Sequence, residues 1–290
     1  PHHLKVTRGM ILICIGLFKK VVLANYLGTE VVDPLFNGGV ENANHFIAVY
    51  AYAVQIYCDF SGYTDIAIGC ALLLGYRFPL NFRNPYTASS IQDFWRRWHI
   101  TLSFWLRDYL YIPMGGARKG FSLKLLFLMI TMLIGGLWHG AGWQFIFWGA
   151  FHGLLLVINH IWVKIADQYV VQRHKSTLWK IFCTFLTFNL ICIAWIWFRA
   201  PNFDAALLIF HQSCLDVVQG KIFSNVNYLT LLAISCGIGM QFQSLASRAK
   251  IERYLGKQAW LFQGAIFALI ISLIEYFAPS GIAPFIYFQF

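Results

Sequence analysis

The sequence predicts an all-α integral membrane protein with several transmembrane helices, on the basis of three observations. Of the 290 residues, 59% are hydrophobic and only 12% are charged, whereas about a quarter of the residues in a soluble domain are charged. Several stretches approach twenty apolar residues, the length that an α-helix needs to cross roughly 30 Å of hydrocarbon. The basic residues are spread over the loops between these stretches rather than gathered on one soluble domain.

We expect seven apolar spans in a single membrane domain covering residues 1–290. The spans are 9–27, 46–75, 122–138, 143–162, 181–198, 226–243 and 259–278. The second contains "DFSGYTD", so we expect two half-helices or one bent helix, with Asp59 and Asp65 either capping the halves or binding a polar group. Lys19 and Lys20 in the first span are expected to extend their amines to the membrane surface.

The loop charges predict the orientation of these spans. The loop 77–124 carries eight Lys and Arg against two acids, and 163–180 and 244–258 each carry four against one. The loop 28–45 has three acids and no Lys or Arg, and 199–225 is balanced. Because cytoplasmic loops of membrane proteins are enriched in Lys and Arg, the three basic loops are expected in the cytoplasm. The formal net charge of +10 therefore indicates orientation rather than nucleic-acid binding.

The segment 84–114 predicts a basic amphipathic helix at the membrane interface. Ser90, with Asp93 three residues later, resembles a capping box. Apolar residues then recur at helical spacing, at Ile91, Phe94, Trp95, Trp98, Leu102, Trp105 and Tyr109. Tryptophan-rich basic helices of this kind lie in the interface or dip into the membrane against protein.

Three histidines are candidates for chemistry. His139, in "GGLWHGAGW", ends an apolar span among small residues. An ionisable group in a membrane span is a functional candidate by default, although a hydrogen-bonded histidine that joins glycine-packed helices fits equally well. His99 borders the interfacial helix, where a packed or solvated residue is the commoner use, and His152 is expected as a hydrogen-bonded core residue. The seven cysteines form no paired motif, so we expect no metal site.

Four blocks of this sequence resemble the membrane-bound O-acyltransferases, most closely the bacterial alginate O-acetyltransferase branch. They are "YCDFSGYTDIAIG", "PLNFRNPYTASSIQDFWRRWHITLSFWLRDYLYIPMGG", "GGLWHGAGWQFIFWGAFHG" and the terminal "PFIYFQF". The resemblance implies a ring of tilted helices around a tunnel, with interfacial or re-entrant helices. Family members usually have further N-terminal helices, so part of the tunnel wall is expected to be absent here.

The resemblance also implies the roles of individual residues. His139 corresponds to the essential catalytic histidine of the family, and His99 to its second active-site position. We expect His139 to act as general base, and His99 to orient the acceptor or to polarise the carbonyl. The glycines around His139 are expected to admit the acceptor. Residues expected to contribute to substrate or donor binding are Trp138, Gly140, Trp95, Arg96, Arg97 and Asp59.

The implied reaction moves an acetyl group from a cytoplasmic donor, with acetyl-coenzyme A as substrate and no bound cofactor. The implied acceptor is an extracytoplasmic polysaccharide such as alginate, or a periplasmic acetyltransferase partner. The implied location of the protein is a bacterial inner membrane. D-alanyl transfer to teichoic acid, as in a related branch, remains an alternative. A membrane transporter is a further alternative, since broken helices and midplane polar residues occur in transporters too. The last alternative is a membrane scaffold without catalytic activity.

Overall fold

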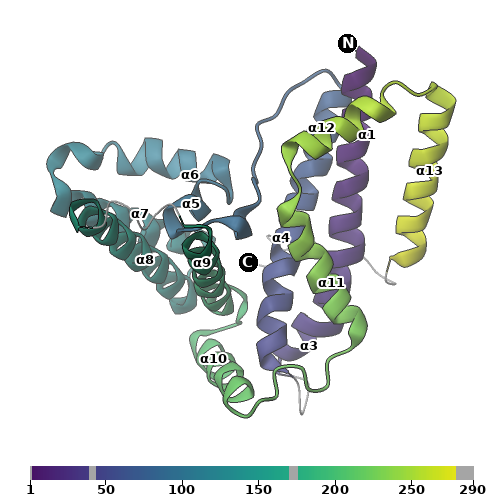
Figure 1. Cartoon of the computed structure of the whole chain (residues 1–290). Helices are drawn as coiled ribbons and strands as arrows, with labels where there is room; N and C mark the ends of the chain where they lie inside the picture. The colour runs from purple at the N-terminus through teal and green to yellow at the C-terminus, as the bar shows by residue number, and fades with distance from the viewer. Residues whose placement is uncertain (1, 39–43, 170–175, 279–290) are drawn as a thin grey trace.

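The computed structural model describes residues 2–38, 44–169 and 176–278, and every regular element in these ranges is helical. Two groups of helices lie side by side (Figure 1). The right-hand group contains α1 (His2–Leu17), α4 (His45–Leu73), α11 (Tyr228–Gly239), α12 (Leu245–Leu255) and α13 (Trp260–Phe277). The left-hand group contains α5 (Ile91–Trp95), α6 (Ile100–Leu106), α7 (Phe121–His139), α8 (Trp143–Tyr169) and α9 (Thr177–Arg199). They are joined by the segment 74–84 and by α10 (Phe203–Val218).

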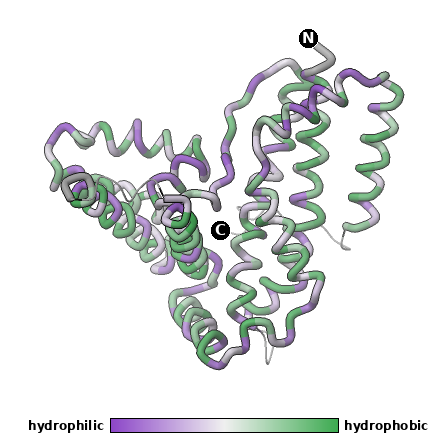
Figure 2. The backbone as a smooth tube through the Cα atoms, viewed as in Figure 1, coloured by the Kyte–Doolittle hydropathy of each residue, from purple (hydrophilic) through white to green (hydrophobic). Residues whose placement is uncertain are grey.

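Five helical runs among the described residues are long and apolar enough to cross a membrane, which confirms the predicted class. They are Lys5–Phe36, Phe121–His139, Trp143–Ala166, Thr177–Arg199 and Trp260–Phe277. The first continues from α1 through π-helical turns, α2 (Asn25–Leu27) and α3 (Asp33–Phe36). A sixth candidate is the pair Tyr228–Phe242 and Ala246–Leu255, which bends by 93°. Hydrophobic residues run along the long helices, and polar residues gather around α12 and the segment after α4 (Figure 2).

The expected interruption of the second span does not occur, because α4 is one continuous helix of 29 residues. Asp59 and Asp65 therefore cap no half-helix. The glycine in "DFSGYTD" serves close packing instead: a Cβ on Gly62 would lie 2.7 Å from the carbonyl oxygen of Gly16 in α1. Gly69 meets Gly9 in the same way, seven residues later in α4 and seven residues earlier in α1. Most of α4 is buried inside the protein, so it needs no wholly apolar surface.

Two lysines of the first span form buried ion pairs with α4 and do not reach the membrane surface as expected. Lys19 Nζ donates to Asp65 Oδ2 at 2.7 Å and to Ser61 Oγ at 3.2 Å. Lys20 pairs with Asp59. Burying a single charge is strongly unfavourable, whereas a hydrogen-bonded pair offsets much of that cost. Because of these two ion pairs, Asp59 and Asp65 of α4 can lie inside the right-hand group of helices.

Loops that the charge pattern placed on the same side of the membrane contact one another. The side-chain amide of Asn44, before α4, donates to the carbonyl oxygen of Lys221 at 2.7 Å. The Asp216 carboxylate accepts from the backbone N–H of His45 at 2.8 Å, at the N-terminus of α4. At the other end of α4, Asn84 Nδ2 donates to the carbonyl oxygen of Gln243 at 3.1 Å. The loops 28–45 and 199–225 thus share one end, and the basic loops after α4 and before α12 share the other.

Removing one partner of the Lys19–Asp65 pair is expected to destabilise the protein strongly. Lys19→Met leaves a buried carboxylate without its cation, which costs about 3–5 kcal/mol. Adding Asp65→Leu removes the unpaired charge, so the double variant should recover most of that loss. The melting temperatures of the wild type, Lys19→Met and the double variant are compared by thermal unfolding in detergent. The matched control is Arg107→Met, which breaks the exposed Arg107–Asp108 pair and should leave the melting temperature unchanged. Equal stability of Lys19→Met and the wild type would contradict the prediction.

Candidate active site

The interfacial segment forms two short helices, not the single amphipathic helix that its periodicity predicts. Ser90 caps the first, α5, with its hydroxyl oxygen 3.1 Å from the backbone nitrogen of Asp93. The Asp93 carboxylate binds the Arg97 guanidinium at 2.9 Å and does not reach back to the cap. The chain leaves the helix after Trp95 and starts again at Ile100. Half of the predicted capping box is therefore present, and the helix breaks at the candidate site.

His99 lies at this break with a left-handed backbone conformation, φ 41° and ψ 57°. This region is uncommon for residues other than glycine, although histidine is among those enriched in it. The extended segment before α5 supplies the partners that hold it there. The backbone N–H of Ile100 donates to the carbonyl oxygen of Asn81 at 3.0 Å, and that of Arg83 donates to Arg97 at 2.9 Å. Tertiary hydrogen bonds therefore provide partners for the N–H of Ile100 and the carbonyl oxygen of Arg97, whereas the N–H groups of residues 96–98 still bond locally to residues 92–94.

The imidazole of His99 is held between a polar and an aromatic neighbour. Its Nδ1 atom is 3.1 Å from Oδ1 of the buried Asn81. Its ring meets the ring of Phe60, from α4, edge to face at 4.8 Å between centroids. Burial lowers the pKa of His99 from its usual 6.5 to about 4, because a charged imidazole loses hydration there. His99 is therefore neutral near pH 7.

His139 ends α7 and is 9% exposed. Its ring lies edge to face with Trp148 of α8 at 5.1 Å and with Phe198 of α9 at 5.0 Å. The preceding Trp138 also contacts it, at 4.9 Å, and is itself 60% exposed. Three membrane helices thus meet around this histidine, with an exposed indole beside it.

The glycines near His139 hold α7 against α8. A Cβ on Gly136 would lie 2.3 Å from the carbonyl oxygen of Phe145 and 3.1 Å from Cα of Gly149. A Cβ on Gly140 would lie 2.4 Å from the Phe145 ring. The space that we expected for an entering acceptor is filled by α8 at these two positions. Close helix packing, the alternative considered for these glycines, accounts for Gly136 and Gly140.

The two candidate histidines come from different segments, His99 from the break between α5 and α6 and His139 from the end of α7. Aromatic side chains connect their surroundings. Trp148, which contacts His139, also meets Trp95 of α5 at 5.8 Å between ring centroids. The site therefore joins α5, α7 and α8. A chamber that holds both imidazoles and opens on both sides of the membrane stays a prediction.

His152 is fully buried in an aromatic cage, without the hydrogen bonds that we expected. Its ring lies 4.6 Å from Trp148 and 5.1 Å from Trp95, with Phe94 and Trp195 at the outer contacts. Within the described parts of the chain, neither ring nitrogen has a hydrogen-bond partner. Among the described residues, the prediction of a hydrogen-bonded core histidine was therefore wrong, because the neighbours of the His152 ring are largely aromatic.

The remaining predicted binding residues have different surroundings. Trp95 belongs to the aromatic cage, whereas Arg96 is exposed. Arg97 is engaged by Asp93 and by Thr87, whose hydroxyl lies 3.1 Å from its guanidinium. Asp59 pairs with Lys20 inside the right-hand group. Arg97 and Asp59 are thus held by ion pairs, and a role of these four residues in binding stays a prediction.

A cavity of about 250 Å³ leads from the basic end of the protein to Asn81. Residues from α1, α4, the segment 80–84 and α12 line it, including the cationic Arg8, Lys19, Arg83 and Arg248. A second cavity of about 420 Å³ shares Arg8 with it and adds Lys5, Arg77 and Arg253. Sequence reasoning missed these residues, because their positions in the chain are far apart and only the fold brings them together. Asn81 stood in a family block, "NFRN", with nothing to mark it for chemistry.

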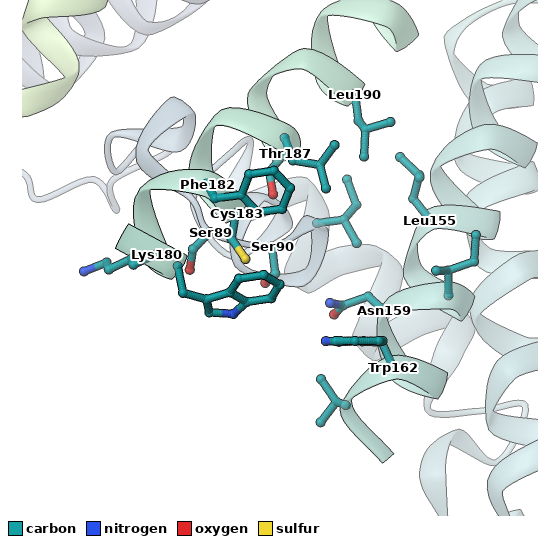
Figure 3. A pocket seen from close by; sticks show the side chains of 15 residues that line it. Ser89, Ser90, Leu155, Asn159, Trp162, Lys180, Phe182, Cys183, Thr187 and Leu190 are labelled. Atoms are coloured by element: carbon teal, nitrogen blue, oxygen red, sulfur yellow. The ribbon is translucent and has the colours of Figure 1, made fainter. Parts of the chain in front are cut away.

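Another cavity, of about 530 Å³, lies between α8 and α9 beside the cap of α5. Figure 3 shows Leu155 and Leu190 at one end and Lys180 and Trp162 at the other. Its lining is mostly apolar and consists of other residues than the two histidines. Across residues 2–38, 44–169 and 176–278, no cluster of three His, Cys, Asp or Glu side chains could hold a metal ion.

Comparison with known proteins gives a consistent assignment. Residues 43–198 match the membrane-bound O-acyltransferase family. The chain is 41% identical over 210 residues to a peptidoglycan O-acetyltransferase of Helicobacter pylori, covering 72% of this chain and 39% of that protein. It is 44% identical over 194 residues to a probable alginate O-acetylase of Pseudomonas putida, covering 66% and 38%.

A third relative, a teichoic acid D-alanyltransferase of Streptococcus thermophilus, is 32% identical over 206 residues, covering 64% of this chain and 50% of that protein. The chain spans less than two fifths of the first two relatives. The resemblance seen in "YCDFSGYTDIAIG", the "RRWH" block and the "WHG" block is thereby confirmed. The fourth block, "PFIYFQF", lies outside the described residues.

Gly136→Ala is expected to destabilise the junction of α7 and α8 that holds His139. The added methyl group meets backbone atoms at 2.3 and 3.1 Å, and overpacking of this kind costs about 1–3 kcal/mol. Thermal unfolding in detergent should show a lower melting temperature. The control is Gly239→Ala in α11, where no atom lies within 4 Å of the added group among the described residues. If both variants melt together with the wild type, α7 and α8 do not pack as described.

Proposed function

Because the chain belongs to the membrane-bound O-acyltransferase family, we propose that the protein transfers an acetyl group from a cytoplasmic thioester to hydroxyl groups of an extracytoplasmic glycan. The observation that supports this most directly is the aromatic, largely buried site at the end of α7. There His139 is 9% exposed between Trp148 and Phe198, and Trp148 contacts Trp95 of the segment that carries His99. Relatives named as peptidoglycan and alginate O-acetylating proteins support acetyl as the group and a bacterial glycan as the acceptor. A bacterial inner membrane is the corresponding location.

In the proposed reaction, His139 acts as general base. The acceptor hydroxyl oxygen attacks the thioester carbonyl carbon while the imidazole of His139 takes the hydroxyl proton. The tetrahedral intermediate then collapses, the carbon–sulfur bond breaks, and the imidazolium returns the proton to the leaving thiolate. A buried aromatic site favours the neutral, basic form of imidazole and limits competing hydrolysis by water. His99 either orients the acceptor hydroxyl or stabilises the developing oxyanion.

The basic cavities suggest how a phosphate-bearing donor such as acetyl-coenzyme A is recognised. Arg83 and Arg248 line the cavity that reaches Asn81, and guanidinium groups bind phosphate oxygens in a bidentate manner. The same cavity lies at the end of the protein where the basic loops meet, which the charge pattern assigns to the cytoplasm. These arginines replace Arg97, whose guanidinium is held by Asp93, as the proposed donor contacts.

His139→Ala is expected to lower acetyl transfer by at least about 10²-fold, because general base catalysis typically contributes 10²–10⁴. The measurement is transfer of labelled acetyl from acetyl-coenzyme A to a glycan acceptor by the protein in liposomes. His211→Gln, an exposed histidine on α10, is the control and should retain full activity. A correctly folded His139→Ala protein with wild-type turnover would remove the assignment. If the protein transfers D-alanine and not acetyl, it belongs functionally with the teichoic acid D-alanyltransferases.

The double variant Arg83→Gln with Arg248→Gln is expected to raise the KM for acetyl-coenzyme A roughly tenfold or more, with kcat little changed. A hydrogen bond to a charged group contributes about 1.5–3 kcal/mol, and the phosphates lie away from the reacting carbonyl. Initial rates at varied donor concentration measure both constants. Arg96→Gln, at an exposed arginine outside this cavity, is the matched control with an unchanged KM. A raised KM for Arg96→Gln together with an unchanged KM for the double variant would place the donor site at the interfacial segment instead.

A further inference from the structure

Three polar atoms of neighbouring residues lie within hydrogen-bond distance of one oxygen of the Asn81 side chain. Its Oδ1 lies 3.2 Å from the backbone nitrogen of Thr101, 2.9 Å from the Thr101 hydroxyl and 3.1 Å from Nδ1 of His99. Asn81 is 8% exposed, and its backbone carbonyl accepts from the N–H of Ile100. The first N–H groups of a helix have no intrahelical partner, and His99 provides no side-chain cap for α6. Asn81 therefore caps α6 from a distant segment.

The cap fixes the orientation of the amide. A backbone N–H can only donate, so the Asn81 atom facing the backbone nitrogen of Thr101 must be the carbonyl oxygen and not the NH₂ group. That same oxygen can only accept. The His99 atom facing it, Nδ1, must then carry a proton. A neutral imidazole holds one ring proton, so Nε2 of His99 is left with an open lone pair.

We propose that Asn81 is a positioning residue that holds His99 as the Nδ1–H tautomer, so that Nε2 accepts the hydrogen bond of the acceptor hydroxyl. This inference rests on the proposed acyl transfer and chooses between the two roles that it left to His99. An oxyanion needs a donor, and a bare Nε2 offers none. Orienting the hydroxyl needs an acceptor, which Nε2 provides. His99 therefore aligns the hydroxyl oxygen for attack, and the carbonyl oxygen must find its donor elsewhere.

The neighbours of His99 fit a neutral imidazole. Among the described residues, it contacts the amide of Asn81, the hydroxyl of Thr101 at 3.5 Å and the ring of Phe60. None of these three carries a charge that would favour a second ring proton. Tautomer control of this kind is important in catalysis: in serine proteases, where a carboxylate orients the histidine, the wrong tautomer lowers kcat about 10⁴-fold.

The test reads the tautomer directly by ¹⁵N NMR of the full protein labelled at histidine, in detergent near pH 7. A His99→Gln difference spectrum assigns the His99 signals. We expect Nδ1 to be protonated and Nε2 to be bare in the wild type. A wild-type spectrum with the proton on Nε2 overturns the proposal, whatever the activity. Because this readout requires no turnover, its failure is distinct from failure of the proposed acetyl transfer.

Variants at the same site separate positioning from simple capping. Asn81→Leu removes the acceptor, so we expect loss of the Nδ1–H signal and a roughly 10- to 100-fold lower kcat, the usual effect of losing an orienting partner. Asn81→Asp keeps an acceptor oxygen and should restore the tautomer and a large part of the activity. Thr101→Val removes only the hydroxyl and should retain both. Full activity in a folded Asn81→Leu protein with an altered tautomer would contradict the role of Nε2.

Discussion

The hydrogen bonds between residues 81–83 and residues 97–101 are the interaction on which the candidate site depends. Arg83 N–H binds the carbonyl oxygen of Arg97, and the main chain of Asn81 binds Ile100. A helix end needs partners for its free N–H groups, and in a water-poor setting these must come from the protein. The extended segment supplies them, so the helix can stop after α5 and restart at α6. His99 occupies the resulting break in a conformation that a continuous helix would forbid.

The second requirement is that polar groups inside the helix groups find partners. Lys19 with Asp65 and Lys20 with Asp59 join the first membrane helix to α4. Glycines on both helices allow the backbones to approach closely enough for these pairs to form. The result is a rigid right-hand group whose α4 carries Phe60, the aromatic neighbour of His99. Packing between α1 and α4 thus contributes to the position of an imidazole far away in the sequence.

The left-hand group contributes the other histidine through a different kind of contact. Aromatic rings from α5, α8 and α9 surround His139 and His152, and Trp148 touches both. The indole N–H groups of Trp95 and Trp148 are buried at this boundary and have no hydrogen-bond partner among the described residues. This arrangement is the basis for proposing separate sites for donor binding and for catalysis. In the proposed function, the basic cavities at one end recognise the charged donor, and the aromatic site surrounds the histidine that acts as base.

Hydropathy and loop charge determined the class of this protein, because a bilayer demands long apolar helices and the loop bias reflects their orientation. The ordered blocks around His99 and His139 likewise identified the family and the two candidate residues. Periodicity could not reveal the break at His99, since the apolar spacing continues through it and its cause is a hydrogen bond from residue 81. The sequence pattern also did not predict the ion-pair partners of Lys19 and Lys20 or the continuity of helix α4. Those features depend on which helices become neighbours, and only the tertiary structure decides which donor meets which acceptor.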